Sequence, residues 1–220
     1  MLNKIILVIL MAAFAAIFYL DPALDLEVSS AFYKQGAGFY MRDNALVVFA
    51  YNSVKFICAA FVLGALISIS KKFSLVKSFH PKHYKKVIYV TLVCLLGPGL
   101  IVHTVFKDNF GRPRPHQIEQ FGGTADFQSP LAVSNQCKTN CSFPSGHASV
   151  GYMFIALAFL YTGWAAIALS ITSLLLGLSL GLVRIIQGGH FLSDIVFAGI
   201  VVYLTAYVLD WLIKPRDIAN

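Results

Sequence analysis

The chain has 220 residues, of which 58% are hydrophobic and only 12% are charged, and its mean hydropathy is +0.73. Soluble globular domains usually carry about 25% charged residues, so this composition excludes an ordinary soluble protein and predicts a membrane protein. The formal net charge of +7 does not indicate nucleic-acid binding, because six of the 17 Lys and Arg residues lie in one short segment and no DNA- or RNA-reading module accompanies them.

Apolar runs divide the chain into about six predicted transmembrane helices. A helix of about 20 apolar residues is needed to cross a hydrocarbon core of about 30 Å. The fourth run reaches a sufficient length only if its helix begins near Ser145. We therefore predict an all-α fold and one membrane-embedded domain over residues 1–220. The spans are predicted at about 5–20, 45–70, 87–106, 145–162, 165–186 and 194–213.

The first apolar run also resembles a secretory signal peptide. Lys4 precedes it, and the small residues Ala15 and Ala16 resemble a cleavage site. Cleavage would leave five spans and place the new N-terminus outside the membrane. We predict that the run is instead retained as an uncleaved signal-anchor helix.

Positive charges set the predicted orientation, because cytoplasmic loops carry an excess of Lys and Arg. The N-terminus, the segment between the second and third spans and the C-terminal tail are all basic, and they fall on one side of a six-span bundle. We therefore predict a multi-pass protein of the cytoplasmic (inner) membrane with both termini cytoplasmic. The segments 21–44, 107–147 and 187–194 then face the periplasm or exterior. The basic segment holds Lys71, Lys72, Lys77, Lys82, Lys85 and Lys86.

Two features of the first half have open interpretations. Lys55 lies with Asn52 inside the second span, where a charge is costly, and it either snorkels outward or reaches a substrate phosphate or a carboxylate. A group of aromatic residues in the first outward segment predicts an interfacial belt or a short surface helix, with substrate gating as the alternative. These residues are Phe32, Tyr33, Phe39 and Tyr40.

The four cysteines are of two kinds. Cys58 and Cys94 lie within apolar runs and are predicted to be ordinary buried residues. Cys137 and Cys141 lie in the largest outward segment, where an oxidising compartment favours a small disulfide loop over two free thiols. A zinc site would need about four ligands, and His147 is the only obvious addition, so no metal is predicted.

Three polar clusters lie where apolar runs meet the outward side, although polar residues are costly at a membrane. Residues 107–115 follow the third span, residues 143–147 open the fourth, and residues 184–194 join the fifth and sixth. The predicted topology brings all three clusters to one face of the bundle.

The clusters contain the elements of a phosphate-binding site. Lys107, Arg114 and Arg184 supply three cations, and arginine guanidinium groups match phosphate oxygens in a bidentate manner. Ser145 and Gly146 lie at a predicted helix start, where free backbone N–H groups and the helix dipole favour an anion.

The third cluster also supplies a candidate nucleophile. If the last helix begins near His190, then His190 and Asp194 share one helix face; if it begins only at Asp194, they can still meet across a turn. Asp194 would accept the Nδ1 proton of His190 and leave Nε2 free to attack phosphorus. His147 would serve as general acid and then as general base. No metal or cofactor is needed. The alternative is a structural salt-bridge cluster of Arg184, His190 and Asp194.

The motifs K-x6-R-P (residues 107–115), P-S-G-H (144–147) and R-x5-H-x3-D (184–194 with x denoting any residue) together resemble the signature of the type 2 phosphatidic acid phosphatase superfamily. The resemblance implies an all-helical fold, a phosphohistidine intermediate on His190 and the same roles for His147 and Asp194. One departure is Val183, where the family usually has Ser; the missing hydroxyl predicts a modest change in phosphate affinity.

The expected substrate is a phosphorylated membrane lipid, because the predicted site opens near the outer headgroup layer. The segment 121–127 and the cysteine pair resemble bacterial lipid A phosphatases, which favours lipid A as the substrate. Undecaprenyl diphosphate and phosphatidylglycerol phosphate are the alternative substrates. Two other classes stay open: a lipid phosphotransferase, and a non-enzymatic transporter or scaffold. The partners expected are thus a phosphorylated lipid and the bilayer, without nucleic acid.

Overall fold

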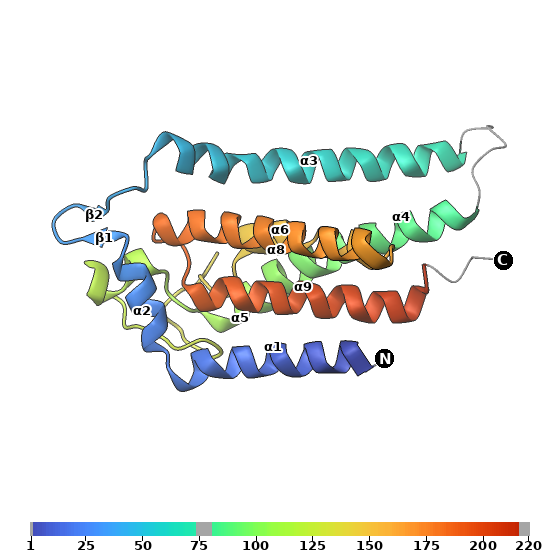
Figure 1. Cartoon of the computed structure of the whole chain (residues 1–220). Helices are drawn as coiled ribbons and strands as arrows, with labels where there is room; N and C mark the ends of the chain where they lie inside the picture. The colour runs from blue at the N-terminus through green and yellow to red at the C-terminus, as the bar shows by residue number, and fades with distance from the viewer. Residues whose placement is uncertain (1, 74–80, 216–220) are drawn as a thin grey trace.

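Long helices running side by side make up most of the structure, a computed structural model that describes residues 2–73 and 81–215 (Figure 1). Strand pairing in this described part is limited to one two-stranded hairpin and one isolated bridge. The predicted all-α fold is therefore confirmed. The long helices are α1 (Leu2–Leu20), α3 (Ala45–Phe73), α4 (Pro81–Cys94) with its π-helical continuation η1 (Leu95–Phe106), α8 (Gly163–Ile186) and α9 (Leu192–Ile213).

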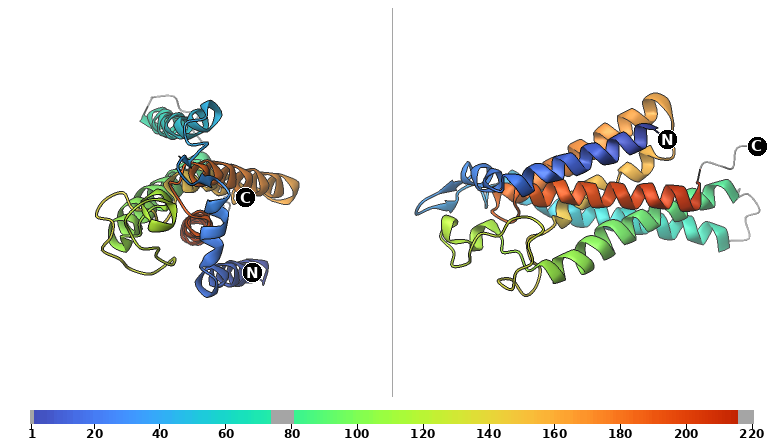
Figure 2. Two further views of the ribbon diagram at one scale, coloured as in Figure 1. Left: turned by 90° about the vertical axis from the view of Figure 1, so that its left-hand side faces the viewer. Right: turned by 90° about the horizontal axis from the view of Figure 1, so that it is seen from below.

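In the described part of the chain, four helical segments are long and apolar enough to cross a membrane, which is typical of a multi-pass membrane protein. They are Ala45–Ile67, Tyr84–Phe106, Gly163–Ile186 and Leu192–Ile213. Viewed along the bundle, α9 lies between the other helices, and its apolar window is the most buried of the four (Figure 2). The start of α1 and the end of α9 lie at one end of the bundle, and the hairpin lies at the opposite end (Figure 1).

The fourth predicted span is shorter than the sequence suggested. It consists of α6 (Gly146–Tyr152) and α7 (Ile155–Ala158), which are separated by a turn at Met153 and Phe154. Every residue of α6 except His147 is buried, and α6 packs against α8 and α9. Protein rather than lipid surrounds this interruption, so its irregular backbone is tolerated.

The third predicted span begins earlier than predicted, at Pro81 instead of near residue 87. Proline is favoured in the first turn of a helix because its missing N–H would lack a helical partner there. Pro98 lies inside the same span, in the π-helical part, where the wider turn accommodates a residue without an N–H. The Lys-rich segment that set the predicted orientation falls partly outside the described residues, as does Arg216.

The segments that were predicted to face outward fold into short elements. These are α2 (Ala23–Ser30), the strands β1 (Tyr33–Lys34) and β2 (Gly38–Phe39), α5 (Lys107–Phe110), and the 3-10 turns η2 (Pro115–Gln117) and η3 (Glu119–Phe121). Of the two structures expected for Phe32, Tyr33, Phe39 and Tyr40, the surface helix is excluded, because Gly36 and Gly38 adopt positive φ and reverse the chain into a hairpin; the interfacial belt stays a prediction. Phe39 is buried, and the centroid of its ring lies 5.5 Å from that of Phe121.

Two glycines set how closely α6 approaches α8. A Cβ added to Gly151 would lie 2.5 Å from the backbone nitrogen of Gly177, and backbone cannot rotate away as a side chain can. We expect Gly151→Ala to destabilise the fold by about 1–3 kcal/mol through overpacking, measured as a lower melting temperature in detergent. Gly64→Ala is the matched control, since nothing lies within 4 Å of the added Cβ. Equal melting temperatures for the two variants would contradict the packing described.

Candidate active site

The connection between α8 and α9 holds His190 and Asp194. The last helix begins at Leu192, between the two starts considered from the sequence. The backbone N–H of Phe191 donates to Asp194 Oδ2 at 2.9 Å, which fixes the carboxylate at the helix start. Nδ1 of His190 lies 3.4 Å from the same oxygen, and both side chains are buried. Nε2 is thus the imidazole nitrogen that remains available for chemistry.

Other elements hold the Asp194 carboxylate in place. Ser142 Oγ donates to Oδ2 at 2.5 Å, and Arg112 donates to Oδ1 at 2.6 Å. The backbone N–H of Ser145 donates to the carbonyl oxygen of Asp194 at 3.0 Å, which ties the start of α6 to the start of α9. With the Phe191 N–H and His190 Nδ1, Ser142 and Arg112 make four donors to the Asp194 carboxylate. Four donors favour the ionised form of this buried group and leave it little rotational freedom.

Arg112 is the largest group of the site that the sequence reasoning missed. Besides Asp194, it donates to Asp25 Oδ2 at 2.8 Å and to Ser193 Oγ at 2.8 Å. Its guanidinium lies 4.3 Å from the Phe191 ring centre, and only 1% of the side chain is exposed. The sequence signal for Arg112 was weak, because the residue lies beside the matching Arg114 in a basic, Pro-rich stretch.

Asp25 was also missed, because it lies in the short helix α2, far from the three motifs in sequence. Oδ1 of Asp25 accepts a hydrogen bond from the Ser193 backbone N–H at 2.8 Å, and Oδ2 accepts one from Ser193 Oγ at 2.5 Å. Burial raises the pKa of Asp25, and the positive charge of Arg112 opposes that rise. Arg112 therefore links the carboxylates of two distant segments in a water-excluded place.

Arg184 comes from the last turn of α8. Its guanidinium donates to Gln187 Oε1 and lies 4.9 Å from the centre of the Tyr51 ring. Its Nε is buried and makes no hydrogen bond to any residue that the structure describes. Gly189 lies directly beside it, and a Cβ there would lie 2.1 Å from a guanidinium nitrogen, so a larger residue would displace the Arg184 side chain. A buried donor without a partner is costly, so an anion placed here would satisfy it.

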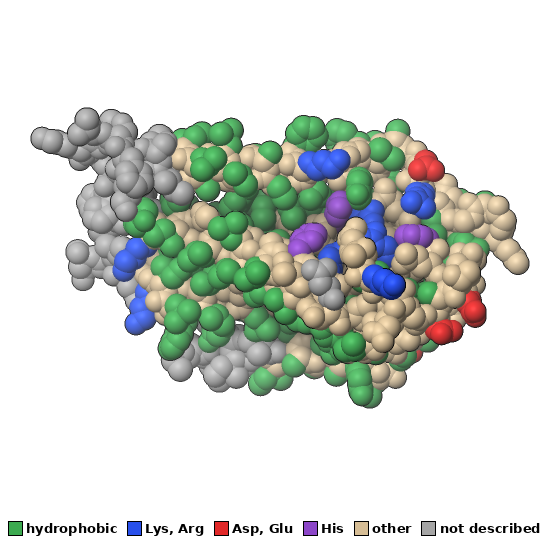
Figure 3. Space-filling model, turned by 180° about the vertical axis from the view of Figure 1, so that it is seen from behind, with side chains coloured by type: hydrophobic (Ala, Val, Ile, Leu, Met, Phe, Trp, Pro, Cys, Tyr) green, Lys and Arg blue, Asp and Glu red, His purple; other side chains and the backbone are tan. Residues whose placement is uncertain are grey.

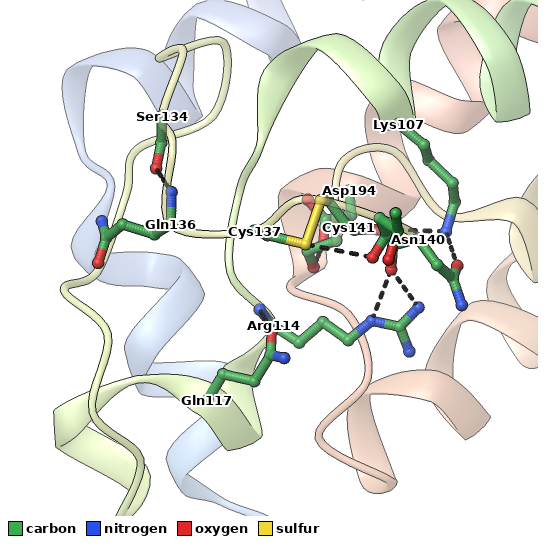
Figure 4. Close-up of a disulfide and its surroundings, with 11 residues drawn as sticks. Lys107, Arg114, Gln117, Ser134, Gln136, Cys137, Asn140, Cys141 and Asp194 are labelled. Carbon is green, nitrogen blue, oxygen red and sulfur yellow. Dashed lines mark hydrogen bonds between the residues drawn. A yellow bond between two sulfur atoms is a disulfide. The ribbon is translucent and has the colours of Figure 1, made fainter.

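Lys107 and Arg114 both donate hydrogen bonds to Asn140 (Figure 4). Lys107 Nζ donates to Asn140 Oδ1 at 3.2 Å and to the carbonyl oxygen of Cys141 at 3.1 Å. Arg114 donates twice to the carbonyl oxygen of Asn140, at 2.7 and 3.2 Å. A disulfide between Cys137 and Cys141 closes the small loop that carries Asn140. The loop thereby places both cations of the first motif near Asp194 (Figure 4).

His147 lies in the first turn of α6. Its ring stacks on the ring of Tyr51 at a centroid distance of 4.5 Å, so Tyr51 contacts both His147 and Arg184. No sequence motif pointed to Tyr51. Ser145 caps α6, with its Oγ accepting from the Ala148 N–H at 3.4 Å. The structure thus commits the Ser145 side chain to the helix start, and phosphate binding by Ser145 and Gly146 stays a prediction.

A cavity of about 360 Å³ is lined by Arg114 and Arg184 and by Tyr51, the residue that contacts His147; neither His147 nor His190 is among its lining residues. Figure 3 shows Lys, Arg and His side chains gathered toward one end of a face that is otherwise mainly hydrophobic. Among the cations that line the cavity, neither Arg114 nor Arg184 has a carboxylate partner in the described part of the chain. The lining residues are Arg42, Asp43, Val48, Tyr51, Asn52, Arg114, His116, Arg184, Gln187 and Gly189.

The electrostatics of His190 favour a neutral ring. Burial lowers the pKa of His190 well below its ordinary value of about 6.5, and the hydrogen bond with Asp194 opposes the shift. The charges of Lys107 and Arg184 also lower it. A neutral imidazole whose Nδ1 faces a carboxylate can act as a nucleophile through Nε2. Within residues 2–73 and 81–215, no group of three or more His, Cys, Asp or Glu side chains is arranged to hold a metal ion.

Comparison with known proteins identifies relatives along most of the chain. The PAP2 superfamily model matches residues 86–217. A lipid A 4'-phosphatase of Francisella tularensis subsp. novicida (strain U112) is 39% identical over 216 residues, which cover 93% of each chain. A lipid A 4'-phosphatase of Rhizobium leguminosarum is 28% identical over 202 residues, or 84% of each chain. No solved structure matches the chain.

Removal of Arg112 tests whether it holds the buried carboxylates together. Breaking a buried ion pair by removing one partner costs about 3–5 kcal/mol, because the other charge is left uncompensated. We expect Arg112→Met to lower the melting temperature in detergent strongly, and Asp25→Asn in the same chain to recover part of the loss. Arg114→Met is the matched control, since Arg114 bonds only neutral groups. Similar melting temperatures for Arg112→Met and Arg114→Met would contradict this role.

Proposed function

Since the chain belongs to the PAP2 superfamily, we propose that it is a membrane phosphatase that releases phosphate from lipid A. Two relatives that align over at least 84% of both chains carry the name lipid A 4'-phosphatase, which supports this substrate. The observation that carries the proposal is the buried pair of His190 and Asp194. It is accompanied by two arginines, Arg114 and Arg184, that have only neutral hydrogen-bond partners among the described residues.

In the proposed first step, Nε2 of His190 attacks phosphorus while the bond from phosphorus to the lipid oxygen breaks. His147 donates a proton to the departing oxygen, so the lipid leaves as an alcohol. Asp194 holds Nδ1 and stabilises the positive charge that develops on the ring. The product on the enzyme is a phosphohistidine at His190.

The cations have a defined task in this step. Negative charge on the three equatorial phosphate oxygens must be stabilised as the bonds change, and preorganised donors do so without reorganising. Arg184 offers its buried Nε, and Arg114 and Lys107 are held near each other by Asn140. A phosphate bound here would give Arg184 Nε the hydrogen bond that it lacks among the described residues.

In the second step, His147 accepts a proton from a water molecule, whose oxygen attacks the phosphohistidine. The bond between phosphorus and Nε2 breaks, inorganic phosphate leaves, and neutral His190 is restored. Both steps use only side chains of this protein. A lipid alcohol in place of water would make the same enzyme a phosphotransferase, and release of free phosphate without an added acceptor distinguishes the two.

The location of the protein follows in part from the helices. The apolar helices and the relatives support a multi-pass protein of the inner membrane. We propose that residues 1–220 form one membrane-embedded domain with both termini in the cytoplasm and the site facing the periplasm. The basic segment between the second and third spans supports this orientation. The start of α1 and the end of α9 lie at the end of the bundle opposite the hairpin, in agreement with it (Figure 1).

Phosphate release in detergent tests the histidine mechanism. The panel holds lipid A, undecaprenyl diphosphate, phosphatidylglycerol phosphate and phosphatidic acid, each assayed with EDTA and without added metal. We expect EDTA-resistant release from lipid A, a loss of about 10⁴-fold or more in His190→Ala, and a loss of about 10²- to 10⁴-fold in His147→Ala. His83→Ala, in the first turn of α4, is the control. Unchanged activity in His190→Ala would show that this residue is not the nucleophile.

The acid limb of the pH profile tests the state of His190. Because burial lowers its pKa, the ring stays neutral as the pH falls through 6.5 and becomes protonated only at lower pH. We expect the limb of kcat/KM that reports the nucleophile to lie below pH 6.5. The second ionisation of the substrate phosphate, near pH 6, is measured separately by phosphorus NMR and subtracted. An enzyme limb at or above pH 6.5 would contradict a neutral, buried nucleophile.

A further inference from the structure

The cavity lined by Arg114 and Arg184 has two walls that come from different halves of the chain. One wall holds Arg114, Arg184 and Gln187, which lie inside the PAP2 superfamily match at residues 86–217. The other wall comes from residues 42–52, which lie outside that match. The first wall therefore belongs to the part of the chain that matches the superfamily. We expect the second wall to contact the part of the substrate beyond the phosphate.

The second wall is a defined structure and not a loose loop. The backbone N–H of Arg42 donates to the carbonyl oxygen of Phe39 at 3.0 Å, so Arg42 follows directly from the hairpin. Asn44 Oδ1 accepts the N–H of Leu46 at 3.0 Å and caps the start of α3. Arg42 and Asp43 are thus held between two ordered elements, with their side chains exposed at the cavity.

The charges of the two walls act on each other. Burial lowers the pKa of Arg114, and the positive charge of Arg42 contributes to that shift. Burial also lowers the pKa of His116, and the charges of Arg42, Arg114 and Arg184 lower it further. Three guanidinium groups around one cavity repel one another in the absence of an anion, so the cavity favours an anionic ligand.

Phosphate alone does not account for the second wall. Asp43 is a carboxylate, and a site that bound only phosphate would gain nothing from it. Asn52 and Gln187 add amide groups, so the lining combines donors and acceptors. Hydroxyl groups both donate and accept hydrogen bonds, and such a mixed lining suits them. The volume of about 360 Å³ lies in the range of small-molecule sites, about 300–1,000 Å³, and a phosphate group fills only part of it.

We propose that Arg42 and Asp43 form a subsite for the sugar ring that carries the scissile phosphate, and that they determine the preference for phosphorylated glycolipids. This inference rests on the proposed function and assigns the specificity to a segment outside the superfamily match. Arg42 donates to ring hydroxyl groups, and Asp43 accepts from them. A glycerol or prenyl phosphate presents fewer or no hydroxyl groups here and leaves the subsite unsatisfied.

Kinetics with two lipids test the subsite. A hydrogen bond to a charged group contributes about 1.5–3 kcal/mol, so we expect Arg42→Met and Asp43→Asn each to raise KM for lipid A by about 10- to 100-fold. Their kcat for lipid A should change less than about threefold. Because the charge of Arg42 attracts any anion, kcat/KM for phosphatidic acid should also fall in Arg42→Met, but at least threefold less than for lipid A, and it should change less than about threefold in Asp43→Asn. Lys34→Met and Asp126→Asn are matched controls, because both residues are exposed in outward segments and neither lines the cavity. Equal losses on both lipids, or no loss, would overturn the proposal.

A binding measurement separates this inference from the proposed function. Calorimetry on the purified protein compares glucosamine 6-phosphate with glycerol 3-phosphate, and it needs no turnover of any lipid. We expect the wild-type protein to bind the sugar phosphate at least about tenfold more tightly, and Arg42→Met and Asp43→Asn to lose that preference. If lipid A is not cleaved but this preference is found and lost in the variants, the proposed function fails and the subsite stands. Equal binding of the two phosphates by the wild-type protein would overturn the subsite.

Discussion

The site depends on a buried ion pair network in which one arginine holds two carboxylates. Arg112 bonds Asp25 of α2 and Asp194 of α9, and all three side chains are almost wholly excluded from water. Removing Arg112 would leave two buried carboxylates without their cation, which is far more costly than losing a surface contact. The network therefore fixes the carboxylate that faces His190, and it does so from a helix that lies outside the three motifs.

Arg112, Arg114 and Arg184 have different hydrogen-bond partners, and these partners indicate which of them stabilises the fold and which can bind a substrate. Arg112 is surrounded by carboxylates and aromatic rings, which leaves no place for a substrate. Arg114 and Arg184 bond neutral oxygens, and both line the cavity. A guanidinium whose charge is not balanced by a carboxylate in the described part of the chain retains its attraction for an anion. The same residue type thus stabilises the fold at one position and is available to phosphate at another.

The sequence predicted the all-α bundle and the pairing of His190 with Asp194, because apolar run length and helical spacing are local properties. It could not place Asp25 or Tyr51, since their roles arise from contacts with residues more than 80 positions away. The interruption between α6 and α7 was also beyond a hydropathy pattern, because burial by neighbouring helices decides whether an irregular backbone is tolerated. The aromatic residues between positions 32 and 40 were compatible with an interfacial belt or a surface helix, and only the backbone conformation of Gly36 and Gly38 excludes the helix.

The N-terminal part of the chain contacts the half that matches the superfamily at three places. Asp25 reaches the buried network, Phe39 packs against Ile118, Phe121 and Phe191, and Tyr51 contacts both His147 and Arg184. These contacts couple the position of the cavity wall to the proposed catalytic residues. Arg42 and Asp43 take part in none of the three contacts, so we expect a change at either residue to alter the proposed headgroup preference while Arg112 and Asp194 keep His190 in place.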